Sequence, residues 1–66
     1  MIKLVNRMKK EVKRNLNYYL DSARCFNATG LAEEFINQDK SHDEDSYFDA
    51  AVIVAEWAEK TYSLNV

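Results

Sequence analysis

The chain of 66 residues contains no proline and a single glycine, Gly30. Proline ends helices and glycine weakens them, so a chain that almost lacks both has few points at which a helix must stop. Apolar residues recur every three or four positions along most of the sequence, which is the period of an α-helix, whereas a strand would require alternation. The sequence therefore predicts an all-α fold.

The first helix is expected over residues 2–26, because one narrow apolar stripe continues through that range. The stripe consists of Val5, Met8, Val12, Leu16, Tyr19, Ala23 and Phe26. Residues 27–30 are expected to end this helix, with Gly30 taking the positive φ that glycine adopts without steric cost. Asn27 and Thr29 are both candidates to cap the helix that follows.

A short second helix is expected over residues 31–38, followed by a long third helix whose first turn holds Asp43, Glu44 and Asp45 and which continues to about residue 63. The polar run at 39–45 separates them, and Ser41 with Glu44 matches a capping box at the start of the third helix. Acidic residues crowd the first turn of that helix, where the helix dipole favours them. The expected architecture is a single three-helix domain, with helices that are long, short and long.

Size and composition limit what this domain, residues 1–66, can do. A chain this short buries only about 60% of its unfolded surface, so a single core is marginally stable. Cys25 has no partner for a disulfide, and one cysteine with one histidine cannot form a zinc cage. No metal or cofactor is expected. The chain lacks an apolar run of about 20 residues and a signal-peptide pattern, so a cytoplasmic protein without a membrane span is expected.

The third helix is apolar on two nearly opposite faces, which predicts that it is covered on more than one side. One face holds Phe48, Ala51, Val52, Ala55, Ala58 and Tyr62, and the other holds Tyr47, Ala50, Ile53, Val54, Trp57 and Leu64. We expect this helix at the core and also at the interface of a homo-oligomer, most simply a two-fold dimer. The interface residues predicted are Tyr47, Val54, Trp57 and Thr61. The alternative is that this helix is the central helix of a monomer.

Charge is unevenly distributed along the chain. Residues 1–14 hold six cations and one acid, whereas residues 15–66 hold three cations and ten acids, and the net charge is −2. Four of the cations, Lys3, Arg7, Lys10 and Arg14, have helical spacing and are predicted to form a basic stripe about 16 Å long. Such a stripe fits an anionic partner, and the alternative is a solvated face that keeps the protein soluble.

Other chemistries have little support in the sequence. The acids between Asp39 and Asp49 resemble a calcium loop, but Glu44 stands where that loop needs glycine and Ala50 where it needs glutamate. Helix capping explains the same residues. Cys25 and His42 are far apart in the sequence, so a catalytic pair of these two has no support. A single glycine excludes a phosphate-binding glycine loop.

The sequence therefore predicts a small non-enzymatic helical interaction module. It is expected to self-associate through the third helix and to act as a regulator or inhibitor by binding a partner protein, as small proteins encoded by mobile elements or phages often do. The alternative function is an oligomer that binds an anionic ligand, a nucleotide or a nucleic acid, through the basic stripe.

Overall fold

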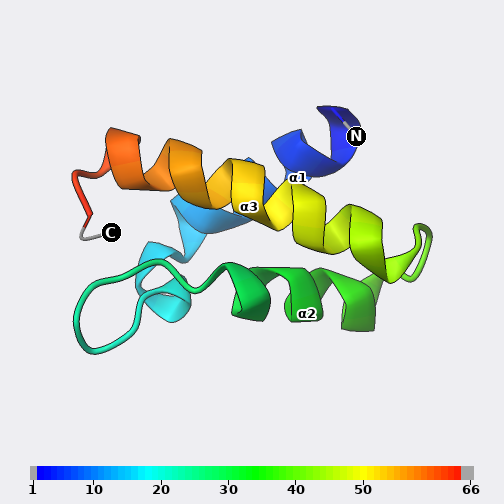
Figure 1. Cartoon of the computed structure of the whole chain (residues 1–66), viewed down its shortest axis with the longest axis horizontal. Coiled ribbons are helices and arrows are strands. Elements are labelled where there is room, and N and C mark those ends of the chain that lie inside the picture. The colour runs from blue at the N-terminus through cyan, green and yellow to red at the C-terminus, as the bar shows by residue number, and fades with distance from the viewer. Residues whose placement is uncertain (1, 65–66) are drawn as a thin grey trace.

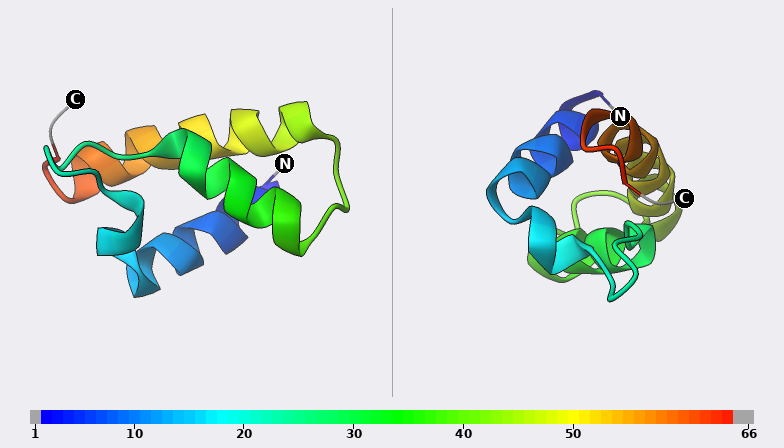
Figure 2. Two further views of the ribbon diagram at one scale, coloured as in Figure 1. Left: turned by 90° about the horizontal axis from the view of Figure 1, so that it is seen from below. Right: turned by 90° about the vertical axis from the view of Figure 1, so that its left-hand side faces the viewer.

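The computed structural model describes residues 2–64 and consists of three α-helices and one short 3-10 helix (Figure 1). They are α1 (Ile2–Arg14), η1 (Leu16–Tyr19), α2 (Ala28–Gln38) and α3 (Glu44–Thr61). The predicted all-α class is confirmed. Helices α2 and α3 lie side by side and run in opposite directions, and the view along the long axis shows the three helices arranged around one core (Figure 2).

The first helix ends at Arg14, twelve residues before the predicted end. Asn15, with φ −135° and ψ 46°, leaves the helical region, and its side chain donates a hydrogen bond back to the Glu11 carboxylate at 2.9 Å. The chain then forms η1, which places Tyr19 in the core. Asparagine has a low helix propensity, so a break at this position costs little and lets the chain turn to bury Tyr19.

Residues 20–27 form a loop, whereas the sequence predicted helix through residue 26. Leu20 and Phe26 form an antiparallel bridge that closes the loop. Inside it, the Asp21 carboxylate accepts hydrogen bonds from the backbone N–H groups of Ala23 and Cys25, both at 2.9 Å. These hydrogen bonds satisfy two backbone N–H groups that would have been paired within a helix. A turn closed by the Asp21 side chain therefore takes the place of the predicted helix.

Helix α2 begins three residues earlier than predicted, with Asn27 as its N-cap. The Asn27 side chain accepts a hydrogen bond from the Gly30 N–H at 3.0 Å, which confirms one of the two predicted caps. Gly30 lies inside the first turn of α2 and has no positive φ, so its predicted role in ending the first helix is wrong. A Cβ at Gly30 would lie 2.7 Å from Asn27 Nδ2, so glycine leaves room for the cap.

Helix α3 is capped by Asp43 rather than by the predicted Ser41. The Asp43 carboxylate accepts hydrogen bonds from the Ser46 hydroxyl at 2.6 Å and from the Ser46 N–H at 3.4 Å. The hydrogen bond from the Ser46 hydroxyl lowers the pKa of Asp43 below its usual value. The helix ends at Thr61, and Ser63 then takes a φ of 53°.

The core lies between the three helices, and α3 packs against both α1 and α2. Helix α1 buries Leu4, Met8 and Val12, so Leu4 faces inward although the predicted stripe omitted it. Helix α3 buries parts of both its apolar faces, namely Tyr47, Ala50, Ala51, Val54, Ala55 and Ala58. The other two helices therefore cover more of α3 than the sequence suggested, because small alanines let both neighbours approach closely.

Candidate interaction surfaces

The four predicted basic-stripe residues all lie on the solvent side of α1. We call Lys3, Arg7, Lys10 and Arg14 the cationic face of α1, and all four are exposed. They follow one another at spacings of four, three and four residues, so they form one row along the helix. At 1.5 Å per residue the row is about 16 Å long.

Arg7 differs from the other members because it also holds the fold together. Its Nη1 lies 2.7 Å from Asp39 Oδ2, and its guanidinium lies 5.4 Å from the centroid of the Phe35 ring. This hydrogen bond from Arg7 lowers the pKa of Asp39. Arg7 therefore connects α1 to the C-terminal end of α2, and part of its charge is neutralised within the chain.

Glu11, the one acid of α1, has a structural role. Its carboxylate accepts hydrogen bonds from the Asn15 side chain and from the Tyr19 hydroxyl, the latter at 3.2 Å, and lies 3.8 Å from the Arg14 guanidinium. Burial, together with the negative charge of Glu11, raises the pKa of Tyr19. Glu11 thus fixes η1 against α1. Because Arg7 pairs with Asp39 and Arg14 with Glu11, Lys3 and Lys10 are the two cations of the face that have no ion pair among residues 2–64.

Sequence reasoning missed a second basic cluster beside this face. The ammonium groups of Lys9 and Lys13 lie 5.2 and 5.9 Å from the centroid of the Trp57 ring on α3. Cation–π contact and the packing of their aliphatic stems explain the partial burial of Trp57. The spacing of four residues between the two lysines was the available signal, but it did not reveal which aromatic they meet.

The structure separates the four residues predicted for the oligomer interface. Tyr47 and Val54 are buried in the core of this chain, so they are not available to another molecule in this fold. Trp57 is partly covered by α1, and Thr61 is exposed at the end of α3. These four residues therefore do not form one surface, because α1 and α2 cover the side of α3 on which Tyr47 and Val54 lie.

A different set of apolar residues remains open on α3. Val52, Ile53 and Phe48 are 51%, 45% and 37% exposed, and we call them the outer face of α3. Three partly exposed side chains amount to no more than a few hundred Å², which is the size of the largest apolar patch on a typical monomer. A standard interface buries roughly 800 Å² per partner. The outer face alone is too small for a strong dimer.

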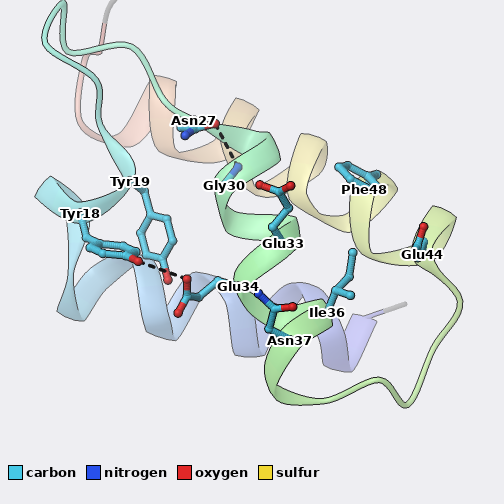
Figure 3. Close-up of a pocket in the computed structure, with 10 residues that line it drawn as sticks. All are labelled: Tyr18, Tyr19, Asn27, Gly30, Glu33, Glu34, Ile36, Asn37, Glu44 and Phe48. Carbon is cyan, nitrogen blue, oxygen red and sulfur yellow. Dashed lines mark hydrogen bonds between the residues drawn. The ribbon is translucent and has the colours of Figure 1, made fainter.

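One hollow of the surface is acidic. A groove of about 520 Å³ runs along α2, between η1 and the start of α3. It is lined by Tyr18, Tyr19, Asn27, Gly30, Glu33, Glu34, Ile36, Asn37, Glu44 and Phe48, and we call it the acidic groove (Figure 3). The Tyr18 hydroxyl, on a side chain 69% exposed, donates a hydrogen bond to Glu34 at 3.2 Å, which raises the pKa of Tyr18.

Cys25 and His42 do not form a pair within the chain. The loop at 20–27 that contains Cys25 and the loop at 39–43 that contains His42 lie at opposite ends of the molecule (Figure 1). The His42 ring instead contacts Tyr47 edge-on, with centroids 5.5 Å apart. Within residues 2–64, no group of three histidine, cysteine, aspartate or glutamate side chains is placed to hold a metal ion. No described helix is long and apolar enough to span a membrane.

Comparison with known proteins gives no match: no family model, no curated protein and no solved structure is significantly similar to this chain.

Proposed function

We propose that this protein is a small non-enzymatic interaction module that binds a compact acidic surface of a partner protein through the cationic face of α1. One observation carries the proposal: a helix of 13 residues holds six cations, and the four of its cationic face are exposed. In this view the protein is a cytoplasmic regulator or inhibitor of the kind that mobile elements or phages encode. It acts by occupying the partner's surface.

The charge of the rest of the molecule favours a compact partner over a long polyanion. Residues 28–61 hold nine acids and two lysines, a net charge of −7, within a molecule of 31 × 20 × 20 Å. The Debye length at physiological ionic strength is about 8 Å, so charges on the far side are screened, whereas those near the edges of α1 are not. A nucleic acid that continued past α1 would be repelled by these acids, and an acidic patch as short as the helix would not.

The proposal is tested with a short polyglutamate peptide as the probe and Trp57 fluorescence as the signal. The double variant Lys3→Glu, Lys10→Glu reverses the two unpaired cations, and we expect it to weaken binding by at least about tenfold. The matched control, Lys40→Glu with Lys60→Glu, changes the net charge equally outside α1 and should bind nearly as the native chain does. Equal losses in both variants would contradict the proposal.

A nucleic-acid probe distinguishes the alternative function. A single-stranded oligonucleotide of the same charge as the peptide is titrated under the same conditions. The proposal predicts that the peptide binds at least as tightly as the oligonucleotide at every salt concentration. Clearly tighter binding of the oligonucleotide, with a slope of log affinity against log salt of about −3, would instead identify a nucleic-acid binder that uses four phosphate contacts.

The outer face of α3 supports a second candidate function, weak self-association into a two-fold dimer. The supporting observation is the exposure of Val52 and Ile53 on adjacent positions of one helix. Val52→Lys should reduce the solution mass to that of one chain, and Ile2→Lys, at an isoleucine that is 77% exposed on α1, should not. A native chain that remains a monomer at high protein and high salt concentration would exclude this candidate.

A further inference from the structure

The chain carries two large surfaces of opposite charge. Helix α1 holds six cations and Glu11, a net charge of +5, and the segment that contains α2 and α3 has a net charge of −7. Only two ion pairs form within residues 2–64, Arg7 with Asp39 and Arg14 with Glu11. Most of the charge on both surfaces therefore remains unpaired within one molecule.

The acidic groove has the composition that a basic side chain requires. Glu33, Glu34 and Glu44 supply carboxylates, and Ile36 and Phe48 supply apolar surface beside them. Lysine and arginine side chains bind such surfaces with the aliphatic stem against the apolar part and the charged end on the carboxylates. The exposed ring of Tyr18 adds a π face for a cation at one end of the groove (Figure 3).

The cationic face cannot fill this groove in its own molecule. The groove is lined only by η1, α2, the start of α3 and the Asn27 cap, and no residue of α1 reaches it. Lys3 and Lys10 point to solvent on α1 and have no ion pair with any of the described acids. A second copy of the chain carries the complementary surface. Each copy supplies one cationic face and one acidic groove, so the two surfaces are always present in equal amounts.

We propose that the cationic face of α1 docks in the acidic groove of a second copy of this chain. This inference rests on the proposed function and names one partner of the same surface. Two copies can exchange these surfaces reciprocally in a two-fold dimer, or they can join head to tail, in which case each added copy leaves one cationic face and one groove free. In both arrangements the assembled fraction increases with protein concentration, and an acidic partner protein competes with the second copy for α1.

Salt dependence of the native chain is the first test. Light scattering coupled to gel filtration should show a mean mass at least about twofold above one chain at low ionic strength, where the Debye length is near 30 Å. The mass should fall to that of one chain at about 1 M salt, where it is near 3 Å. A mass equal to one chain at every salt concentration would overturn the inference, and a dimer that salt does not change would assign the contact to the outer face of α3.

A pair of charge-reversed variants provides the decisive test. The α1 variant, Lys3→Glu with Lys10→Glu, lacks the cationic face, and the groove variant, Glu33→Lys with Glu44→Lys, lacks the acidic groove. Each alone should be a monomer. Their mixture should form a one-to-one pair that grows no further, because only the groove of the first and the cationic face of the second are intact.

The matched control is Asp49→Lys with Glu56→Lys, which changes the charge equally on the exposed side of α3 outside the groove. It should assemble like the native chain. If a reversed variant fails to fold by circular dichroism, the neutral replacements Lys3→Gln with Lys10→Gln and Glu33→Gln with Glu44→Gln take its place. A mixture that shows no pairing would overturn the inference.

Failure of this inference is distinguishable from failure of the proposed function. If the native chain stays a monomer at low salt but still binds the polyglutamate peptide through Lys3 and Lys10, self-docking is wrong and the acidic-partner proposal stands. If neither occurs, both are wrong. A polyglutamate peptide that binds and also dissociates the native assembly supports both proposals, because the peptide and the second copy then compete for the cationic face of α1.

Discussion

Arg7 Nη1 lies 2.7 Å from Asp39 Oδ2, and this ion pair joins the first turns of α1 to the residue that ends α2. The two residues are 32 positions apart in the sequence. A member of the predicted binding stripe is thus also a tertiary contact. Its replacement affects folding as well as binding, and for this reason the binding tests above replace Lys3 and Lys10.

Acid should weaken the fold through Asp39 and Asp43. The folded-state pKa of both carboxyls is lowered, by the hydrogen bonds from Arg7 and from Ser46 respectively. A lowered folded pKa contributes stability in full above the unfolded pKa of 3.8, and this contribution is lost as the pH falls through the lower folded value. We expect the urea concentration at the unfolding midpoint to decrease as the pH is lowered below about 4. Asp39→Asn with Asp43→Asn should flatten this dependence, and an unchanged slope would contradict it.

The Tyr47 hydroxyl should contribute to stability by closing the loop before α3. It accepts hydrogen bonds from the backbone N–H groups of Ser41 at 3.0 Å and of His42 at 3.2 Å. Tyr47→Phe removes the acceptor of both bonds, and because Ser41 and His42 are exposed and water can replace it, we expect a cost of about 1 kcal/mol in the free energy of unfolding. Urea denaturation measures the change. Tyr62→Phe, on a partly buried tyrosine whose hydroxyl has no hydrogen bond within residues 2–64, should cost less.

Two valines of α3 provide a direct test of which face is buried. Val54 is fully buried, whereas Val52 is half exposed only two positions away. Val54→Ala should reduce the free energy of unfolding by about 2 kcal/mol, because it removes buried methyl groups and leaves a cavity. Val52→Ala should change it by no more than about 0.5 kcal/mol. Equal costs would contradict the difference in burial between the two valines, and a larger cost at Val52 would place the core on the other face of α3.

Gly30→Ala should be nearly neutral in the native chain and stabilising when the cap is absent. The new Cβ would lie 2.7 Å from Asn27 Nδ2 and would displace the capping side chain. Loss of the cap costs about 1 kcal/mol, and replacing helical glycine by alanine returns about 0.5–1 kcal/mol. In an Asn27→Ala background only the gain remains. Thermal unfolding of the native chain, the two single variants and the double variant measures the coupling between the two positions. Additive changes in stability would contradict the predicted contact between the new Cβ and Asn27.

Much of the secondary structure could be predicted from local pattern. The period of apolar residues located three helices, and Asn27 was one of two predicted caps. Local chemistry was less decisive at α3, where Asp43 caps the helix although Ser41 and Glu44 matched a familiar pattern. Several polar side chains in one turn can each accept the same N–H groups, and the path of the chain decides which one is placed to do so.

The composition and spacing of this sequence determined that it is helical, where α2 and α3 lie, and that α1 carries the positive charge. Tertiary packing alone decided that the first helix stops at Arg14, because Tyr19 must turn back to reach the core and Glu11 holds it there. Packing also decided that Val54 is covered and Val52 is not. A helix with two apolar faces has no local preference between them, and only the directions from which α1 and α2 approach determine which face is buried.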